Sequence, residues 1–90
     1  MHVPVFTRQF HKDLKRSRRR GKNMEKLKQI VRTLLDGMPL DPVHRDHRLL
    51  GRFAGRRECH IEFDWLLMYK IADQRIYFER MGTHADLFRT

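Results

Sequence analysis

Hydrophobic positions in the first half of the chain recur at the spacing of helices. They predict one helix over residues 7–20, with Thr7 as its N-cap and Gly21 just past its end. A second helix is expected after Asn23, another suitable N-cap, and Gly37 would end it. The apolar stripes predicted to face a core are Phe10 and Leu14 in the first helix, and Met24, Leu27, Ile30, Val31, Leu34 and Leu35 in the second.

The rest of the chain carries the shorter pattern of strands. Val3–Phe6 predicts a strand at the edge of a sheet, because Pro4 cannot donate to a central ladder. After a loop, Met38–Asp46, four segments of strand length are separated by turn residues and followed by a tail, Gly82–Thr90. These strands are expected at Arg48–Phe53, Arg57–Glu62, Trp65–Ala72 and Arg75–Met81. The order predicts a single α+β domain over residues 1–90, in which a helical hairpin packs on an antiparallel sheet.

Positive charge is concentrated in the two predicted helices. The formal net charge is +9, and the segment from Thr7 to Arg32 carries eleven basic against two acidic residues, so all the excess lies there. Such a field favours a polyanionic partner: nucleic acid, an acidic protein or an anionic membrane. The densest part favours nucleic acid over a merely solvated helix face; it comprises Lys15, Arg16, Arg18, Arg19, Arg20 and Lys22.

Cysteine content and hydropathy indicate the compartment. Cys59 is the only cysteine, so no internal disulfide can form, which is typical of a reducing cytoplasm. No apolar run approaches the ~20 residues that span a bilayer, and the first ten residues lack the layout of a signal peptide. We therefore expect a cytoplasmic protein that does not act at a membrane.

Five residues that could carry out acid–base chemistry fall near the ends of predicted strands. His60 lies late in one strand and Asp64 occupies the turn that follows it, while Arg80 and His84 lie at the end of the last strand. Because neighbouring strands run antiparallel, the last strand ends where the preceding one began, so we expect all four residues at one edge. His47 is a plausible fifth member, because it precedes the second strand.

These residue types suit the cleavage of RNA. Two histidines can act as general base and general acid near neutral pH, and an arginine can bind the phosphate. The ribose 2′-hydroxyl supplies the nucleophile, so neither a metal ion nor another cofactor is expected. Trp65 or Phe88 could stack on a base, although each could equally pack in the core or hold the tail. The histidines with Asp64 could instead bind a metal, but they lack the close spacing of a specific metal motif.

Three motifs resemble the YafQ branch of the RelE/ParE toxin superfamily. They are D-H-x-L-x-G from Asp46 to Gly51, H-x-E-x-D-W from His60 to Trp65, and R-x-G-T-H from Arg80 to His84. The resemblance covers essentially the whole chain and is strongest from Arg45 to Phe88. It implies a RelE-like fold and a toxin, paired with an antitoxin protein, that cleaves messenger RNA in the ribosomal A site.

The resemblance also implies roles for individual residues. His47, His60, Asp64 and His84 match the catalytic set, and Arg80 matches the arginine beside the phosphate. We expect His84 to act as the general acid, with either His47 or His60 as the base. Among the remaining positions, Phe88 matches a C-terminal aromatic residue, Glu58 a supporting acidic residue, and Lys15 to Lys22 the contacts with ribosomal RNA.

The resemblance gives expectations for assembly and leaves other functions open. The toxin alone is expected to be a monomer, and its complex with the antitoxin a higher-order assembly. ParE relatives share the fold but inhibit DNA gyrase without cleaving RNA, so a gyrase inhibitor is the main alternative. A plain RNA-binding module and a metal-dependent nuclease are further alternatives.

Overall fold

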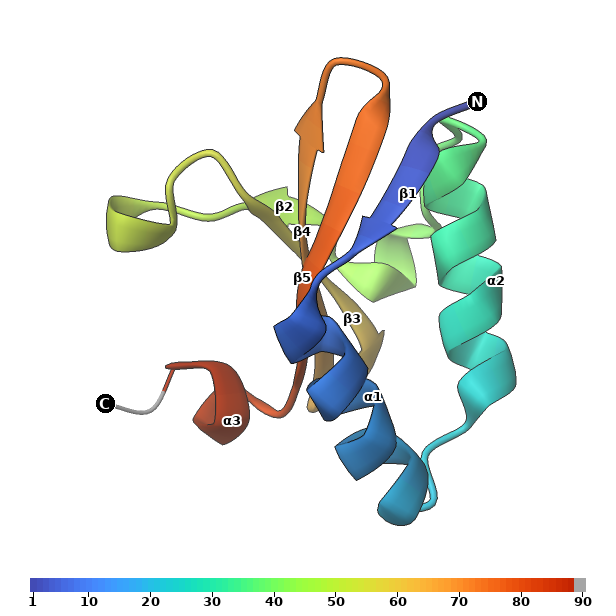
Figure 1. Cartoon of the computed structure of the whole chain (residues 1–90), viewed down its shortest axis with the longest axis vertical. Coiled ribbons are helices and arrows are strands. Elements are labelled where there is room, and N and C mark those ends of the chain that lie inside the picture. Colours follow the sequence, from blue (N-terminus) through green and yellow to red (C-terminus); the bar gives the residue numbers. More distant parts are fainter. Residues whose placement is uncertain (89–90) are drawn as a thin grey trace.

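A computed structural model of the chain describes residues 1–88. Its five-stranded sheet has the order β1-β5-β4-β3-β2, in which β1 runs parallel to β5 and the other neighbours are antiparallel. Figure 1 shows α2 on one side of the sheet, with α3 and the loop between β2 and β3 on the other. The elements are β1 (Val3–Phe6), α1 (Arg8–Arg19), α2 (Met24–Leu35), β2 (His47–Arg48), β3 (Arg57–Glu62), β4 (Trp65–Ala72), β5 (Arg75–Gly82) and α3 (His84–Phe88), with single 3-10 turns at Pro42–His44 and Gly51–Phe53.

The two long helices begin at the predicted caps. The Thr7 hydroxyl accepts a hydrogen bond from the backbone N–H of Phe10 at 3.0 Å, and the Asn23 side chain accepts from the N–H groups of Glu25 and Lys26. These contacts satisfy donors that have no partner within the helix. No helix within residues 1–88 has the length and apolar character to cross a lipid bilayer.

The core lies between the helical hairpin and one face of the sheet. Phe10 of α1 and Leu27, Ile30 and Leu34 of α2 are buried there as predicted. They pack against side chains that alternate along the strands, so the residues between them occupy the opposite face. The sheet contributes Cys59, Ile61, Trp65, Leu67, Tyr69, Ile76, Phe78 and Met81 to this core.

Beyond the end of β1, helix α1 lies along the open edge of β5. The backbone N–H of Met81 donates to the Asp13 carboxylate at 2.9 Å, and Arg16 donates to the Met81 carbonyl at 2.9 Å. Asp13 is fully buried, and Arg80 donates to its carboxylate as well. Side chains of α1 thus replace a neighbouring strand and satisfy the edge of the sheet where β1 has ended.

The structure differs from the sequence predictions at two elements, β2 and α3. The strand expected at Arg48–Phe53 is reduced to the two residues of β2, because Gly51 has a positive φ of 67° and turns the chain away from β3. Leu50 looked like a strand residue, yet it is 84% exposed and makes no core contact. The tail, in which no element was predicted, contains α3, which is too short for helical periodicity to reveal it.

Candidate active site

One part of the site lies on the sheet face that points away from the helical hairpin. Glu58 and His60 occupy this face of β3, and His47 of β2 stands directly opposite Glu58. One oxygen of Glu58 lies 3.7 Å from Nε2 of His47 and 3.6 Å from Nε2 of His60. The Glu58 side chain is only 5% exposed, so a nearly buried carboxylate stands between two accessible imidazoles.

The outer nitrogens of these two imidazoles are held by backbone carbonyls. Nδ1 of His47 lies 2.6 Å from the carbonyl of Arg45, and Nδ1 of His60 lies 3.2 Å from that of Phe63. A carbonyl only accepts hydrogen bonds, so each Nδ1 carries a proton and Nε2 remains for proton exchange. Both Nε2 atoms face Glu58, which can accept a hydrogen bond from either imidazole when its Nε2 is protonated.

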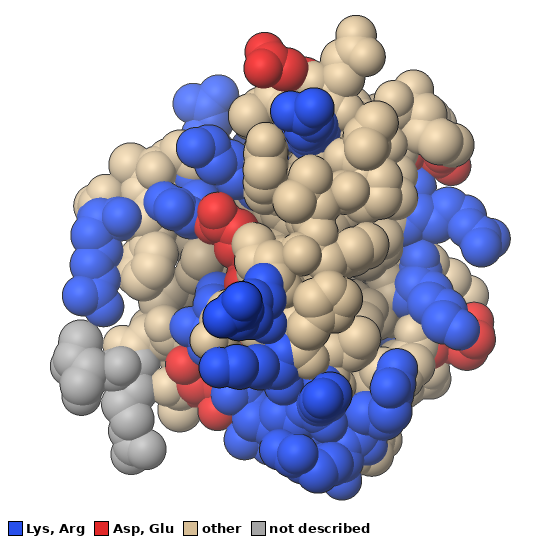
Figure 2. Space-filling view, viewed as in Figure 1, with Lys and Arg blue, Asp and Glu red and all other residues tan. Residues whose placement is uncertain are grey.

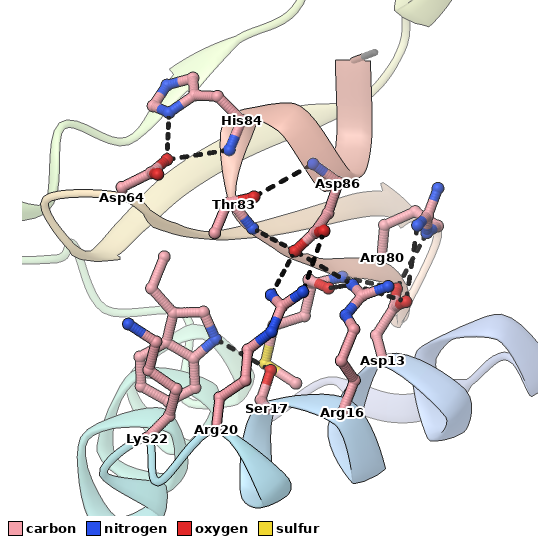
Figure 3. A network of polar contacts seen from close by, with 12 residues as sticks. Asp13, Arg16, Ser17, Arg20, Lys22, Asp64, Arg80, Thr83, His84 and Asp86 are labelled. Atoms are coloured by element: carbon pink, nitrogen blue, oxygen red, sulfur yellow. Dashed lines mark hydrogen bonds and ion pairs between the residues drawn. The ribbon is translucent and has the colours of Figure 1, made fainter. Parts of the chain in front are cut away.

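The second part of the site joins the turn after β3 to the first residue of α3. Nδ1 of His84 lies 2.6 Å from Oδ1 of Asp64, and the backbone N–H of His84 donates to the same oxygen at 2.9 Å (Figure 3). The hydrogen bond from this backbone N–H, and then that from the imidazole, lowers the pKa of the Asp64 carboxyl. Asp64 therefore stays ionised, and its contact with Nδ1 leaves Nε2 of His84 available for proton transfer.

The two parts meet to form a row of three imidazoles. The rings of His84 and His60 are 5.6 Å apart, and those of His60 and His47 are 6.4 Å apart. Phe88 borders the row, with its ring 6.5 Å from His84 and 5.4 Å from Phe53. The structure thus brings together most of the side chains predicted to form the site: His47, Glu58, His60, Asp64, His84 and Phe88.

The site also has the geometry to bind a metal ion. Glu58, His60 and His84 each offer one ligand atom, and these atoms lie within 4.8 Å of one another. Two imidazoles and a carboxylate are ligands that zinc and other transition metals accept. This set differs from the alternative considered from sequence, since Glu58 takes the place of His47 and Asp64.

Arg80 has a partner that the sequence did not indicate. A β-bulge at Glu79 shifts the register so that Arg80 stands opposite Met68, which in turn stands opposite Glu58 on the imidazole face. Its guanidinium turns toward α1, where Nε donates to Asp13 at 2.9 Å. The backbone position of Arg80 thus lies on the predicted face of the sheet, while a buried carboxylate of α1 orients its guanidinium.

Of the two alternatives left open for Trp65, stacking on a base or packing in the core, the structure shows packing in the core. Its side chain is 1% exposed, lies in the core and donates through Nε1 to the Ser17 hydroxyl at 3.2 Å. Lys22 approaches the ring, with Nζ 5.9 Å from its centroid. A ring enclosed in this way offers no face to a nucleotide, so Phe88 is the remaining predicted stacking residue.

The basic cluster of α1 divides into two groups. Arg16 contacts Asp13, Asp86 and the Met81 carbonyl, and Arg20 forms a two-pronged pair with Asp86, so these guanidinium groups hold the fold together. Lys22 lies 3.9 Å from Glu62. Lys15, Arg18 and Arg19 are exposed and form no ion pair within residues 1–88. Figure 2 shows basic side chains gathered around the end of α1 and the turn that follows it.

Sequence reasoning assigned no role to two acidic residues beside the site, Asp13 and Asp86. Asp13 follows Phe10 by three residues and precedes Ser17 by four, so the spacing of a buried helix face was a usable signal. Thr83 and Asp86 have the spacing of a capping box, in which each residue satisfies the backbone N–H of the other. That pattern could have predicted α3.

Comparison with known proteins identifies the family. A family model described as the bacterial toxin of type II toxin–antitoxin system YafQ matches residues 3–89. The mRNA interferase toxin YafQ of Escherichia coli (strain K12) is 44% identical over 84 residues, which cover 92% of this chain and 91% of that protein. The putative toxin YafQ of Haemophilus influenzae is 31% identical over 88 residues, which cover 90% and 86% of the two chains.

Solved structures agree in fold. The crystal structure of the E. coli DinJ–YafQ complex contains a chain with a TM-score of 0.91 and 42% identity, covering 98% of this chain and 99% of that one. A metal-bound toxin from Helicobacter pylori has a TM-score of 0.92 and 34% identity, with coverage of 98% and 100%. The family and the α+β fold predicted from the three motifs are thereby confirmed: this chain belongs to the YafQ family of bacterial toxins of type II toxin–antitoxin systems.

Proposed function

We propose that this toxin is a ribosome-dependent endoribonuclease that cleaves messenger RNA in the A site by metal-independent acid–base catalysis. The observation that carries the proposal is the row of three imidazoles in which Asp64 orients His84. Relatives named mRNA interferase toxins support the reaction class. The exposed cations of α1 would bind ribosomal RNA, and an antitoxin protein is the expected partner, as DinJ is for the E. coli YafQ.

The reaction needs two proton transfers around one phosphorus atom. A base removes the proton of the ribose 2′-hydroxyl, whose oxygen attacks the adjacent phosphorus. The bond to the 5′-oxygen breaks, and this oxygen receives a proton from the acid, which leaves a 2′,3′-cyclic phosphate and a 5′-hydroxyl. In this scheme His84, whose Nδ1 is held by Asp64, is the acid, and His47 or His60 is the base.

The remaining residues support this reaction. Glu58 lies between both candidate bases and can stabilise the charge that either gains with the proton. Arg80, oriented by Asp13, would place positive charge near the phosphate as negative charge develops there. Phe88 is half-buried beside His84 and would stack on a base next to the cut.

Replacing the proposed acid tests the mechanism. We expect His84→Ala to abolish cleavage and to leave ribosome binding intact, because the exposed imidazole contributes little to the fold. The measurement is primer extension on a reporter message translated in vitro, with co-sedimentation to measure ribosome binding. Cuts inside the reading frame that need ribosomes and vanish in the variant support the proposal. Intact message with the wild-type protein refutes it, and equal loss of binding refutes the role of His84.

The positions of Glu58, His60 and His84 favour a metal-dependent nuclease as the second candidate function. If the imidazoles act as acid and base, a chelator selective for transition-metal ions should leave the cleavage rate unchanged, with Mg²⁺ kept at the level that ribosomes need. Added Zn²⁺ should inhibit, because it binds the same nitrogen lone pairs that exchange protons. Loss of cleavage with that chelator, restored by Zn²⁺ or another transition-metal ion while the ribosomes remain intact, would establish the metal-dependent reaction instead.

A further inference from the structure

Asp86 links the N-terminal helix to the helix that carries His84. Its Oδ2 accepts hydrogen bonds from the backbone N–H of Thr83 at 2.9 Å and from Arg20 at 2.6 Å, and lies 3.5 Å from Arg16 (Figure 3). Its own backbone N–H donates to the Thr83 hydroxyl at 3.1 Å. The capping box of α3 is therefore held in place by two arginines of α1, more than sixty residues away in the sequence.

The first turn of α3 depends on these contacts. A helix of five residues is not stable alone, so contacts with the rest of the protein must fix its position. Asp64 holds His84 from one side, but both side chains are more than half exposed, and this ion pair alone is weak. On the other side, the Asp86 side chain is 16% exposed and pairs with both arginines.

Gly82 shows how closely the parts fit. A Cβ atom built on Gly82 would lie 2.6 Å from Nη2 of Arg16 and 2.8 Å from both Cβ and Oδ2 of Asp86. Residue 82 must lack a side chain for the arginine and the carboxylate to meet against the backbone. The closeness leaves the start of α3 little freedom to shift relative to β5.

We propose that Asp86 is a positioning residue, held by Arg16 and Arg20, that fixes His84 for proton transfer. This inference rests on the function proposed above, in which His84 is the general acid. Asp86 touches neither substrate nor the reacting atoms. It acts by holding the turn in which both the backbone N–H and the imidazole of His84 meet Asp64.

The inference gives Arg20 a positioning role in place of the RNA-binding role that was predicted from its charge. As a contact with ribosomal RNA, Arg20 would affect binding. As a residue that holds Asp86, Arg20 affects the chemical step, because a misplacement of the His84 imidazole by ~1 Å can lower a rate about 100-fold. The two roles separate in kinetics, since binding contacts change the concentration for half-saturation and positioning contacts change the maximal rate.

The test is single-turnover cleavage of a message on programmed ribosomes at increasing ribosome concentration. We expect Arg20→Ala and Asp86→Asn each to lower the maximal rate about 10- to 100-fold, with the half-saturating concentration unchanged. Arg20→Lys should recover part of the rate, since it keeps the charge but loses the two-pronged geometry. Arg19→Ala is the matched control on the same helix, and it should raise the half-saturating concentration instead. Thermal unfolding confirms that each variant is folded.

A second readout does not depend on cleavage. The ¹⁵N spectrum of the histidine side chains reports which ring nitrogen of His84 carries the proton. In the wild-type protein it should show the proton on Nδ1, and Asp86→Asn should shift His84 toward a mixture of tautomers while His47 stays unchanged.

The outcomes separate the positioning role from the proposed function. If Arg20→Ala raises the half-saturating concentration and leaves the maximal rate unchanged, Arg20 is a binding contact and the positioning role is refuted. An Asp86→Asn protein with wild-type rate and wild-type His84 spectrum refutes it as well. If the wild-type protein cleaves no message, the proposed function fails, and the spectrum alone still decides whether Asp86 orients His84.

Discussion

At the scale of single residues, the site depends on how each imidazole is oriented. Backbone carbonyls hold Nδ1 of His47 and His60, whereas the Asp64 carboxylate holds Nδ1 of His84. Only His84 therefore has a negative charge directly behind it. Asp64 accepts from both the imidazole and the backbone N–H of His84, and this double contact sets His84 apart from the other two.

Asp64→Asn tests this difference. The amide keeps the shape of the side chain but removes the charge, so the hydrogen bonds from the backbone N–H and the imidazole of His84 weaken and the ring is oriented less firmly. Acid–base groups contribute roughly 10²–10⁴-fold to rates, and we expect the variant to lose a large part of that factor. The measurement is the maximal cleavage rate on saturating ribosomes. A wild-type rate would contradict the role of Asp64.

At the scale of elements, α1 has two structural tasks besides carrying charge. Asp13 and Arg16 satisfy the edge of β5, and Arg16 with Arg20 hold the capping box of α3. The pKa of the Asp86 carboxyl lies far below its usual range, first because of the hydrogen bond from Arg20 and then because of those from Thr83. This shift links the stability of the fold to pH.

The sign of that link follows from the direction of the shift. An unfolded aspartate has a pKa of about 3.9, and the pKa of Asp86 in the folded protein is lower. The stabilisation of the fold by ionised Asp86 is therefore fully present above the unfolded pKa, and it is lost as the pH falls toward the folded pKa. We expect the free energy of unfolding in urea to fall below about pH 4. Asp86→Asn should be less stable at pH 7 by about 1 kcal/mol, since Arg20 is 42% exposed, and should lose less in acid. Equal acid sensitivity of the two proteins would contradict this.

At the scale of the whole molecule, the excess positive charge and the row of imidazoles lie on different surfaces. Residues 7–32 carry the entire net charge of +9, while the rest of the chain is balanced. Figure 2 shows the basic side chains gathered near the end of α1, and the imidazole face lies on the opposite side of the sheet from the helical hairpin. Because Arg16 and Arg20 bind acidic groups of the same chain, the charge available to a nucleic acid comes chiefly from their exposed neighbours.

Replacing Lys15, Arg18 and Arg19 together by glutamine tests this division. Each phosphate contact adds about 0.7 to the salt slope for single strands, so three lost contacts should reduce the slope of log affinity against log salt by about 2. Ribosome association measured across potassium chloride concentrations gives this slope. We expect the maximal cleavage rate to stay near that of the wild type. An unchanged slope would show that these cations face solvent and make no contact with RNA.

Much of the fold and of the site could be predicted because both follow from local periodicity. The caps at Thr7 and Asn23 and the hydrophobic run that begins β4 placed the main elements correctly. The antiparallel return of β5 brought His60, Asp64 and His84 together as expected. β2 was predicted too long and α3 was not predicted, because elements this short carry too few residues to show a period.

By itself, the sequence determined the elements, the concentration of charge and the identity of the histidine site, since each depends on nearby residues or on strand alternation. Only the tertiary structure decided the partners of the long side chains: Arg80 on Asp13, Arg20 on Asp86, and Trp65 inside the core. An arginine can reach in many directions, and its partner here lies more than sixty residues away. Which carboxylate it meets depends on how α1 packs against β5 and α3, and no pattern within either segment encodes that contact.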